Sequence, residues 1–188
     1  MAVWTVTLAL LSALFFSTTS AFLPAPFTLQ AARLGRSSGL CAMSLRSFPG
    51  DEANEVLPGL FIGSKAAAED KAALQSNGIT HVLTTTGMAP PFPDDFEYLV
   101  INLADGGCAI TDDLPGCLEF VSKAREGGSG GVLVHCGGGS GRSGAVTIAA
   151  VMKEKGLSAD DALSFVQRYR SKVSPPEPFM EQLRAGNL

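Results

Sequence analysis

One stretch of the chain decides its fold, and it reads Val132-Leu133-Val134-His135-Cys136-Gly137-Gly138-Gly139-Ser140-Gly141-Arg142-Ser143. It opens with a short apolar run, which is typical of a strand buried at the centre of a sheet. A glycine-rich loop follows, and then a largely apolar helix is expected over 142–155. A strand, a glycine-rich loop and a helix in this order favour phosphate binding, because backbone N–H groups converge at the N-terminus of the helix.

The residue types in this loop indicate catalysis. A Walker A loop would have glycine and lysine at the positions where this chain has Cys136 and Arg142. A cysteine at the start of such a loop lies where its thiolate can attack the phosphorus atom of a bound ester. The loop amides and the helix dipole favour negative charge, so we expect the pKa of Cys136 to lie below the ~8.5 of a free thiol.

The other residues of the loop have distinct predicted roles. Arg142 presents a planar pair of donors that fits two phosphate oxygens. Ser143 can donate a hydrogen bond to the Cys136 sulfur and so ease its departure from a phosphoenzyme. His135 is expected to order the loop through the backbone, and we do not assign it the role of base. The residues expected to surround the phosphate are Gly137, Gly138, Gly139, Ser140, Gly141 and Arg142.

A general acid is needed as well, because cleavage of an alkyl or aryl phosphate requires a proton on the leaving oxygen. Asp105 comes just after a strand expected over 98–103, and the two glycines that follow it suit a mobile loop. We predict that Asp105 donates this proton and later takes one from the hydrolytic water. The rival acids stand at an expected helix start or in a proline-rich loop, and they are Asp112, Asp113, Asp94 and Asp95.

Length and composition fit one ordinary domain, and we expect neither a cofactor nor a metal site because no residue pattern suggests one. The chain has 188 residues, and 46% of them are hydrophobic, which is enough to bury a core. All 18 acidic residues but only 11 of the 14 basic ones lie after residue 50, so residues 51–188 carry a net charge of −7. This charge argues against binding to nucleic acid or to anionic membranes.

The cysteines indicate a reducing compartment. Three of them, Cys108, Cys117 and Cys136, follow residue 50, and an odd number does not suggest a disulfide framework. Cys117 stands between leucines at helical spacing and is expected in the core. A redox disulfide between Cys108 and Cys136 is a further hypothesis.

Residues 1–50 differ from the rest of the chain because they contain arginine but no acidic residue. An apolar run over 3–16, too short to span a bilayer comfortably, is followed by small residues, which predicts a signal peptide over 1–21. The stretch 22–50 opens with Phe22 and has the composition of a transit peptide. The two in series resemble the bipartite presequences of complex plastids. This implies the plastid stroma and no stable membrane association after processing, with secretion as the alternative.

The remaining chain alternates short strand-like and helical segments, which is the α/β pattern. Two extended pieces bent at Pro58-Gly59 come first, and Val132–Val134 is the central strand. Beside these, strands are expected over 81–85 and 98–103, and helices over 65–76, 112–126, 142–155, 159–171 and from 175 to about 185.

Taken together, these motifs resemble the dual-specificity phosphatases of the cysteine-based protein tyrosine phosphatase superfamily. The resemblance covers nearly all of 54–186, and the family acid maps to Asp105. It implies an α/β fold with a small, mostly parallel central sheet flanked by helices, in a catalytic domain over 51–188. The runs 104–107 and 138–143 are also similar to the kinase-associated phosphatase. The signature loop matches at Cys136, Gly139, Arg142 and Ser143.

The resemblance implies hydrolysis of phosphomonoesters on phosphoproteins, at Ser/Thr and Tyr, through a cysteinyl phosphate. A monomer is the default expectation, because the sequence does not indicate an oligomeric state. Two alternatives stay open: a plastid phosphoglucan or small-metabolite phosphatase, and a catalytically weak module that binds phosphorylated partners. The joint presence of Cys136, Arg142, Ser143 and Asp105 favours an active enzyme.

Overall fold

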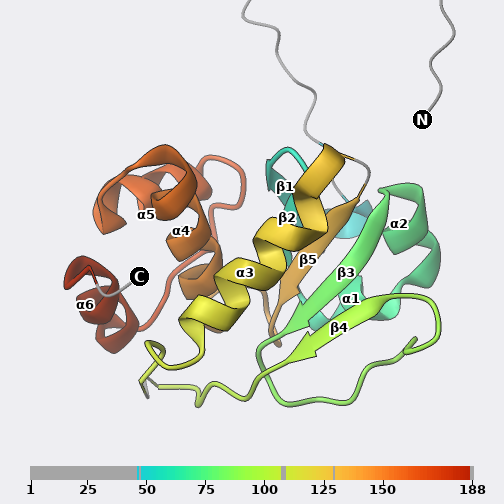
Figure 1. Cartoon of the computed structure of the whole chain (residues 1–188), viewed down its shortest axis with the longest axis horizontal. Helices are drawn as coiled ribbons and strands as arrows, with labels where there is room; N and C mark the ends of the chain where they lie inside the picture. Colours follow the sequence, from blue (N-terminus) through green and yellow to red (C-terminus); the bar gives the residue numbers. More distant parts are fainter. Residues whose placement is uncertain (1–45, 47, 107–108, 129, 187–188) are drawn as a thin grey trace, which may run out of the picture. The chain divides into compact units, whose positions relative to one another are not determined.

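Strand β5, Gly131–His135, lies at the centre of a five-stranded sheet with the order β1-β2-β5-β3-β4 (Figure 1). The computed structural model describes Arg46 and residues 48–106, 109–128 and 130–186. Most of the predicted leader, together with Cys108 and its proposed disulfide, lies outside the described residues. All five residues of β5 are buried, as the apolar run predicted.

The sheet is parallel except at one edge. Strand β1, Ala53–Leu57, pairs antiparallel with β2, Leu60–Gly63, across the predicted bend at Pro58-Gly59. Strands β2 and β3, Ile79–Thr84, both run parallel to β5, and β4, Glu97–Val100, runs parallel to β3. The expected mostly parallel α/β architecture is therefore confirmed.

Helices cover both faces of this sheet. The short helices α1, Lys65–Glu69, and α2, Lys71–Ser76, pack on one face. On the other face lie α3, Leu114–Arg125, α4, Arg142–Lys155, α5, Ala159–Gln167, and α6, Glu177–Arg184 (Figure 1). Side chains alternate between faces along each strand, which divides the core into two clusters.

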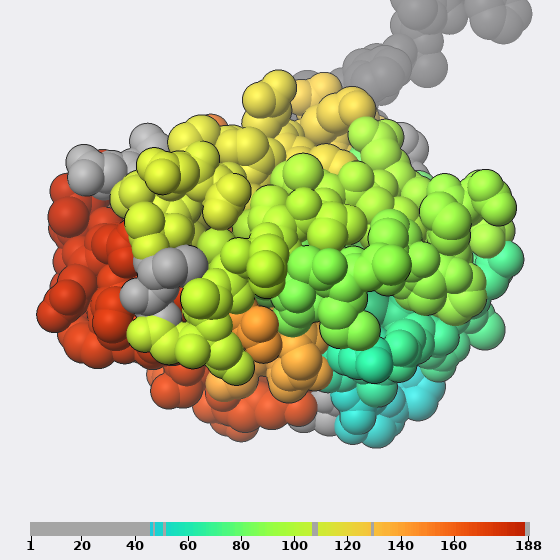
Figure 2. All heavy atoms as spheres, turned by 90° about the horizontal axis from the view of Figure 1, so that it is seen from below, coloured from blue at the N-terminus to red at the C-terminus, as the bar shows by residue number. Residues whose placement is uncertain are grey.

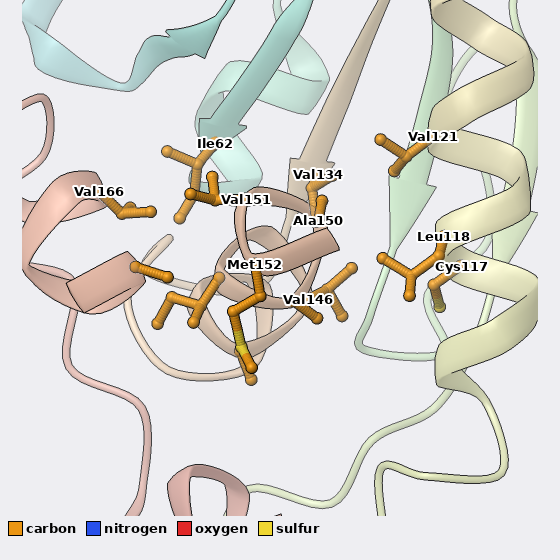
Figure 3. Packing of buried hydrophobic residues seen from close by; sticks show 14 of the residues in the cluster. Ile62, Cys117, Leu118, Val121, Val134, Val146, Ala150, Val151, Met152 and Val166 are labelled. Atoms are coloured by element: carbon orange, nitrogen blue, oxygen red, sulfur yellow. The ribbon is translucent and has the colours of Figure 1, made fainter. Parts of the chain in front are cut away.

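The larger core cluster joins the sheet to α3 and α4. Val134 of β5 and Ile62 of β2 belong to it together with Val146 of α4 and Leu118 of α3 (Figure 3). The residues directly before these two in the strands, Phe61 and Leu133, belong to the smaller cluster with α1 and α2. Since α4 follows the glycine-rich loop directly, this packing holds the helix N-terminus against the end of β5.

The bounds of several predicted elements differ from those observed. The helix expected over 159–171 ends at Gln167. The helix expected over 65–76 is interrupted at Asp70, where the backbone leaves helical geometry with φ −95° and ψ 86°. The Asp70 carboxylate accepts a hydrogen bond from Ala73 N at 2.9 Å and thereby caps α2. The strand expected over 98–103 ends at Val100, and Asn102 only forms an isolated bridge with Thr86.

Contacts of the domain extend N-terminally beyond residue 51. Arg46 donates from Nη2 and Nε to the Glu55 carboxylate, at 3.0 and 3.3 Å, and its guanidinium lies over the ring of Phe61. Phe48 is buried and packs edge-on against the same ring. Within the described part of the chain, no helix combines the length and apolar character needed to cross a membrane.

Candidate active site

The site lies at the carboxyl ends of the parallel strands. The phosphate loop, residues 136–141, leaves β5 at His135 and enters α4 at Arg142, as the sequence predicted. Figure 2 looks at this end of the sheet and shows the loop region in orange at the surface. It is bordered by the yellow-green segment that contains Asp105, by the teal of α1 and by the red C-terminal segment.

The Cys136 sulfur accepts hydrogen bonds from this loop and from the first turn of α4. Gly139 N donates to Sγ at 3.1 Å, and the buried Ser143 hydroxyl donates to it at 3.2 Å. Burial of Cys136 by itself raises its pKa. The Ser143 hydroxyl and the backbone N–H groups of Ser143, Ser140 and Gly139 outweigh this effect, so the pKa lies below the ordinary value of a thiol. The thiolate expected from the loop geometry is therefore favoured.

Gly139 is the glycine that the loop conformation requires. Its φ is +71°, and a methyl group on its Cα would lie 2.6 Å from the carbonyl carbon and oxygen of Gly63. Gly138 has no such constraint, because a methyl group there would meet nothing within 4 Å. The four loop glycines thus differ in role, which the sequence pattern alone did not distinguish.

Arg170 supports the loop from behind, and sequence reasoning missed it. Its side chain is 1% exposed. The guanidinium donates from Nε to Gly139 O at 2.8 Å, from Nη2 to Gly138 O at 3.3 Å and from Nη1 to Asn54 Oδ1 at 2.6 Å. It therefore fixes the loop carbonyls outward, which leaves the loop N–H groups free to face the sulfur and a bound phosphate.

His135 makes hydrogen bonds at the start of the loop, where the sequence predicted a role in ordering it. Its carbonyl accepts hydrogen bonds from Thr85 N at 3.1 Å and Thr85 Oγ1 at 2.9 Å. Its ring lies between the Thr84 hydroxyl, 2.8 Å from Nε2, and the carbonyl oxygen of Cys136, 3.3 Å from Nδ1. Burial lowers the pKa of His135, so the ring is neutral, donates from Nδ1 to the carbonyl and accepts at Nε2.

Arg142 and Asp105 meet at the mouth of the site. Arg142 Nη2 lies 3.3 Å from Asp105 Oδ2, and Nη1 donates to Leu103 O at 3.5 Å. The Asp105 side chain is 75% exposed, so it can reach toward a leaving group in solvent without leaving a packed environment. The structure thus brings the predicted acid beside the predicted phosphate ligand.

Among the described residues, none of the rival acids is hydrogen-bonded to the phosphate loop. Asp113 is the residue before α3, and Asp95 pairs with Lys71 at 2.7 Å. Cys117 lies in the core, as expected, and burial together with the nearby Asp113 carboxylate raises its pKa to about 12, which makes it unreactive. Among the described residues there is no group of His, Cys, Asp and Glu that could hold a metal ion.

A protein family model shows to which family the chain belongs. The model for the dual specificity phosphatase catalytic domain matches residues 60–187, which include the phosphate loop, Asp105 and Arg170. The chain belongs to the dual specificity phosphatase family. Members of this family are cysteine-dependent protein phosphatases, and the loop described above contains the cysteine that this chemistry needs.

Similar proteins agree with this membership. The chain is 41% identical to dual specificity protein phosphatase 1B of Arabidopsis thaliana over 137 residues, 72% of this chain and 81% of that protein. It is 39% identical to dual specificity protein phosphatase 1 of the same plant over 129 residues, 67% of this chain and 64% of that protein.

Solved structures give the same fold. DUSP15 superposes with a TM-score of 0.68 at 32% identity, covering 72% of this chain and 86% of that one. A human tyrosine phosphatase-like serine/threonine/tyrosine-interacting protein superposes with a TM-score of 0.66 at 34% identity. The match covers 71% of this chain and 93% of that one. Since this second protein is named as phosphatase-like and interacting, the fold alone does not separate an enzyme from a binding module, and the side chains of the site must do so.

Proposed function

We propose that this chain hydrolyses phosphomonoesters on phosphoproteins, at Ser/Thr and Tyr, with Cys136 as nucleophile. The observation that carries the proposal is the Cys136 sulfur, which accepts hydrogen bonds from Gly139 N and Ser143 Oγ at the N-terminus of α4. A structural cysteine would lie in apolar surroundings with a raised pKa, as Cys117 does.

The reaction follows from these positions. The Cys136 thiolate attacks phosphorus while Arg142 and the loop N–H groups bind the phosphate oxygens. The bond to the leaving oxygen breaks, and that oxygen takes a proton from Asp105. Water then attacks the cysteinyl phosphate and gives its proton to Asp105. The sulfur leaves as a thiolate that accepts the Ser143 hydrogen bond, and inorganic phosphate is released.

Protein substrates are supported by the names of similar proteins. One of them is MAP kinase phosphatase with leucine-rich repeats protein 1 of Dictyostelium discoideum, 34% identical over 130 residues that make up 15% of that protein. Another is protein-tyrosine-phosphatase MKP1 of Arabidopsis thaliana, 36% identical over 151 residues. The local likeness to the kinase-associated phosphatase stays a prediction, and so does the monomeric state.

The test is turnover by the full chain, in reductant and chelator, of a small aryl phosphate and of phosphotyrosine and phosphoserine peptides. Cys136→Ser serves as the blank, because a hydroxyl in this loop is a far weaker nucleophile than a thiolate. We expect vanadate-sensitive release of phosphate from all three substrates. A folded chain that binds the phosphopeptides but releases no phosphate above the blank would instead be a phospho-binding module.

We also propose that residues 1–50 direct the chain to the plastid stroma. The supporting observations are the short apolar run, Phe22 after the small residues, and the absence of acidic residues in this segment. Fusion of residues 1–50 to a fluorescent protein in an alga with a complex plastid tests this. Stromal fluorescence is expected, and fluorescence in the medium would mean secretion.

A further inference from the structure

Two peptide groups of the phosphate loop are bound on both sides, because the C=O and the N–H of a trans peptide point in opposite directions. Gly138 O accepts a hydrogen bond from Arg170 Nη2 at 3.3 Å. Gly139 N belongs to the same peptide group and donates to Cys136 Sγ at 3.1 Å. Arg170 Nε likewise donates to Gly139 O at 2.8 Å. The N–H of that peptide group belongs to Ser140 and is one of the backbone donors that stabilise the Cys136 thiolate.

Arg170 therefore acts on the sulfur through these two peptide groups, without a hydrogen bond of its own to the sulfur among those described. The guanidinium is buried and lies close to the loop backbone. A methyl group on Gly139 would lie 2.6 Å from the carbonyl group of Gly63 and 2.7 Å from Arg170 Nη2. Because the loop is in close contact with both the end of β2 and the guanidinium, a change in the orientation of Arg170 also changes the orientation of the loop peptides.

The orientation of this guanidinium depends on Asn54, a residue of the edge strand β1. Arg170 Nη1 donates to Asn54 Oδ1 at 2.6 Å, across 116 residues of sequence. Asn54 pairs with Ile62 of β2, and β2 pairs with β5, so the acceptor is held by the same sheet that leads into the loop. A guanidinium is planar and its donors have fixed directions. An acceptor at Nη1 therefore sets the directions in which Nε and Nη2 donate.

We infer that Asn54 is a positioning residue for the reaction: by orienting Arg170, it directs two loop N–H groups at the Cys136 sulfur. The inference rests on the proposed function, because positioning matters to the reaction only if this sulfur is the nucleophile. A merely structural Asn54 would change the stability of the domain and leave the titration of the thiol as it is. The two roles are therefore separated by a measurement on the thiol itself.

The test follows the alkylation of Cys136 by iodoacetamide as a function of pH, in the full chain, by mass spectrometry of the peptide that contains Cys136. In Asn54→Ala the profile should move to higher pH. Alkylation at about pH 6 should fall about three- to tenfold, the effect of weakening hydrogen bonds to a charged acceptor. Asn54→Asp keeps an oxygen at the same position, so its profile should lie between those of the parent and Asn54→Ala.

The matched control is Arg46→Ala, which loosens the same N-terminal segment by removing the partner of Glu55, the next residue in β1. In the described hydrogen bonds Arg46 reaches Glu55 and Asn77 and does not reach the loop. This variant should lose stability and keep the alkylation profile of the parent. An unchanged profile in Asn54→Ala, or equal shifts in Asn54→Ala and Arg46→Ala, would overturn the positioning role.

A second variant covers the case in which Asn54→Ala does not fold. Asn54→Ser is polar but too short to place its oxygen where the amide oxygen lies, so its profile should shift in the same direction, and an unchanged profile would overturn the inference. Aryl phosphate turnover separates the two proposals. A shifted profile in a chain that releases no phosphate supports positioning and refutes the proposed function, whereas normal turnover with an unchanged profile refutes positioning alone.

Discussion

The Arg170 guanidinium donates a hydrogen bond from Nε to the carbonyl oxygen of Gly139, at 2.8 Å, across 31 residues of sequence. The same side chain reaches Asn54 Oδ1 in β1, so one buried cation joins the first strand, the phosphate loop and the turn after α5. The conformation of the loop thus depends on a residue that makes no contact with the sulfur in the described hydrogen bonds.

Replacing Arg170 by lysine should impair both stability and catalysis. Lysine keeps the charge but cannot serve three acceptors with the fixed geometry of the guanidinium, so buried loop carbonyls lose their donors. We expect a loss of about 2–3 kcal/mol in the free energy of unfolding, measured by urea denaturation. Aryl phosphate turnover should fall as well. The pKa of Cys136, measured from the pH dependence of its alkylation rate, should rise. A variant with normal stability and a normal thiol would show that Arg170 does not position the loop.

The loop glycines provide a matched pair of substitutions. Gly139→Ala places a methyl group 2.6 Å from the Gly63 backbone at a positive φ, whereas Gly138→Ala points into open space. We expect Gly139→Ala to cost at least about 1–2 kcal/mol of unfolding free energy from the backbone conformation alone, and more from the clash. Gly138→Ala should stay within about 0.5 kcal/mol of the parent. Similar denaturation midpoints for the two variants would contradict the described loop.

Removing the Asp105 carboxylate should slow substrates in proportion to their need for a proton. For an alkyl phosphate, whose leaving oxygen is strongly basic, we expect Asp105→Asn to lower kcat by about 10²–10⁴. An aryl phosphate with an acidic phenol should be affected much less. Asp112→Asn, at the exposed rival acid before α3, is the control and should leave both rates unchanged. Equal losses for the two substrates would mean that Asp105 binds rather than protonates.

The Arg46–Glu55 pair predicts where a stable domain must begin. Glu55 is buried, which by itself raises its pKa, but hydrogen bonds from Arg46 and from Gly59 N hold the pKa below its usual value. Arg46 is half exposed, so we expect Arg46→Ala to cost only about 1–2 kcal/mol of unfolding free energy at pH 7. Residues 51–188, which lack both Arg46 and Phe48, should be less stable than residues 46–188.

The cost of Arg46→Ala should depend on pH, because the pKa of Glu55 is lowered in the folded state. A carboxyl group with a lowered pKa in the folded state stabilises the fold above its unfolded pKa of about 4.3 and ceases to do so as the pH falls. Urea denaturation at pH 7 and at pH 3 should therefore show a cost of Arg46→Ala at pH 7 that largely disappears at pH 3. A cost independent of pH would assign the effect to packing on Phe61.

The sequence predicted the features that depend on neighbouring residues, and it missed those that depend on residues far apart in the chain. The arrangement of β5, the loop and α4 is local, so apolar runs and glycine spacing were enough to place Cys136 and Ser143 together. The break at Asp70 was missed because alanine-rich surroundings favour helix, while the aspartate competes locally for Ala73 N.

Arg170 and Arg46 escaped prediction for a different reason. The acceptors of Arg170 stand 31, 32 and 116 residues away, and no periodicity encodes such a pairing. Arg46 stands in an acid-free stretch whose composition is that of a leader, although its partner Glu55 belongs to the first strand. Asp105 was placed by its position after β4, even though that strand ends earlier than expected.

The most direct test of the central claim is to trap the phosphoenzyme. The full chain is mixed with an aryl phosphate, quenched within the first turnovers and analysed by mass spectrometry of the peptide that contains Cys136. We predict one added phosphoryl group on Cys136, with more of it in Ser143→Ala, whose sulfur is a poorer leaving group, and none in Cys136→Ser. Phosphate release without any adduct, at an equal rate in Cys136→Ser, would contradict the account.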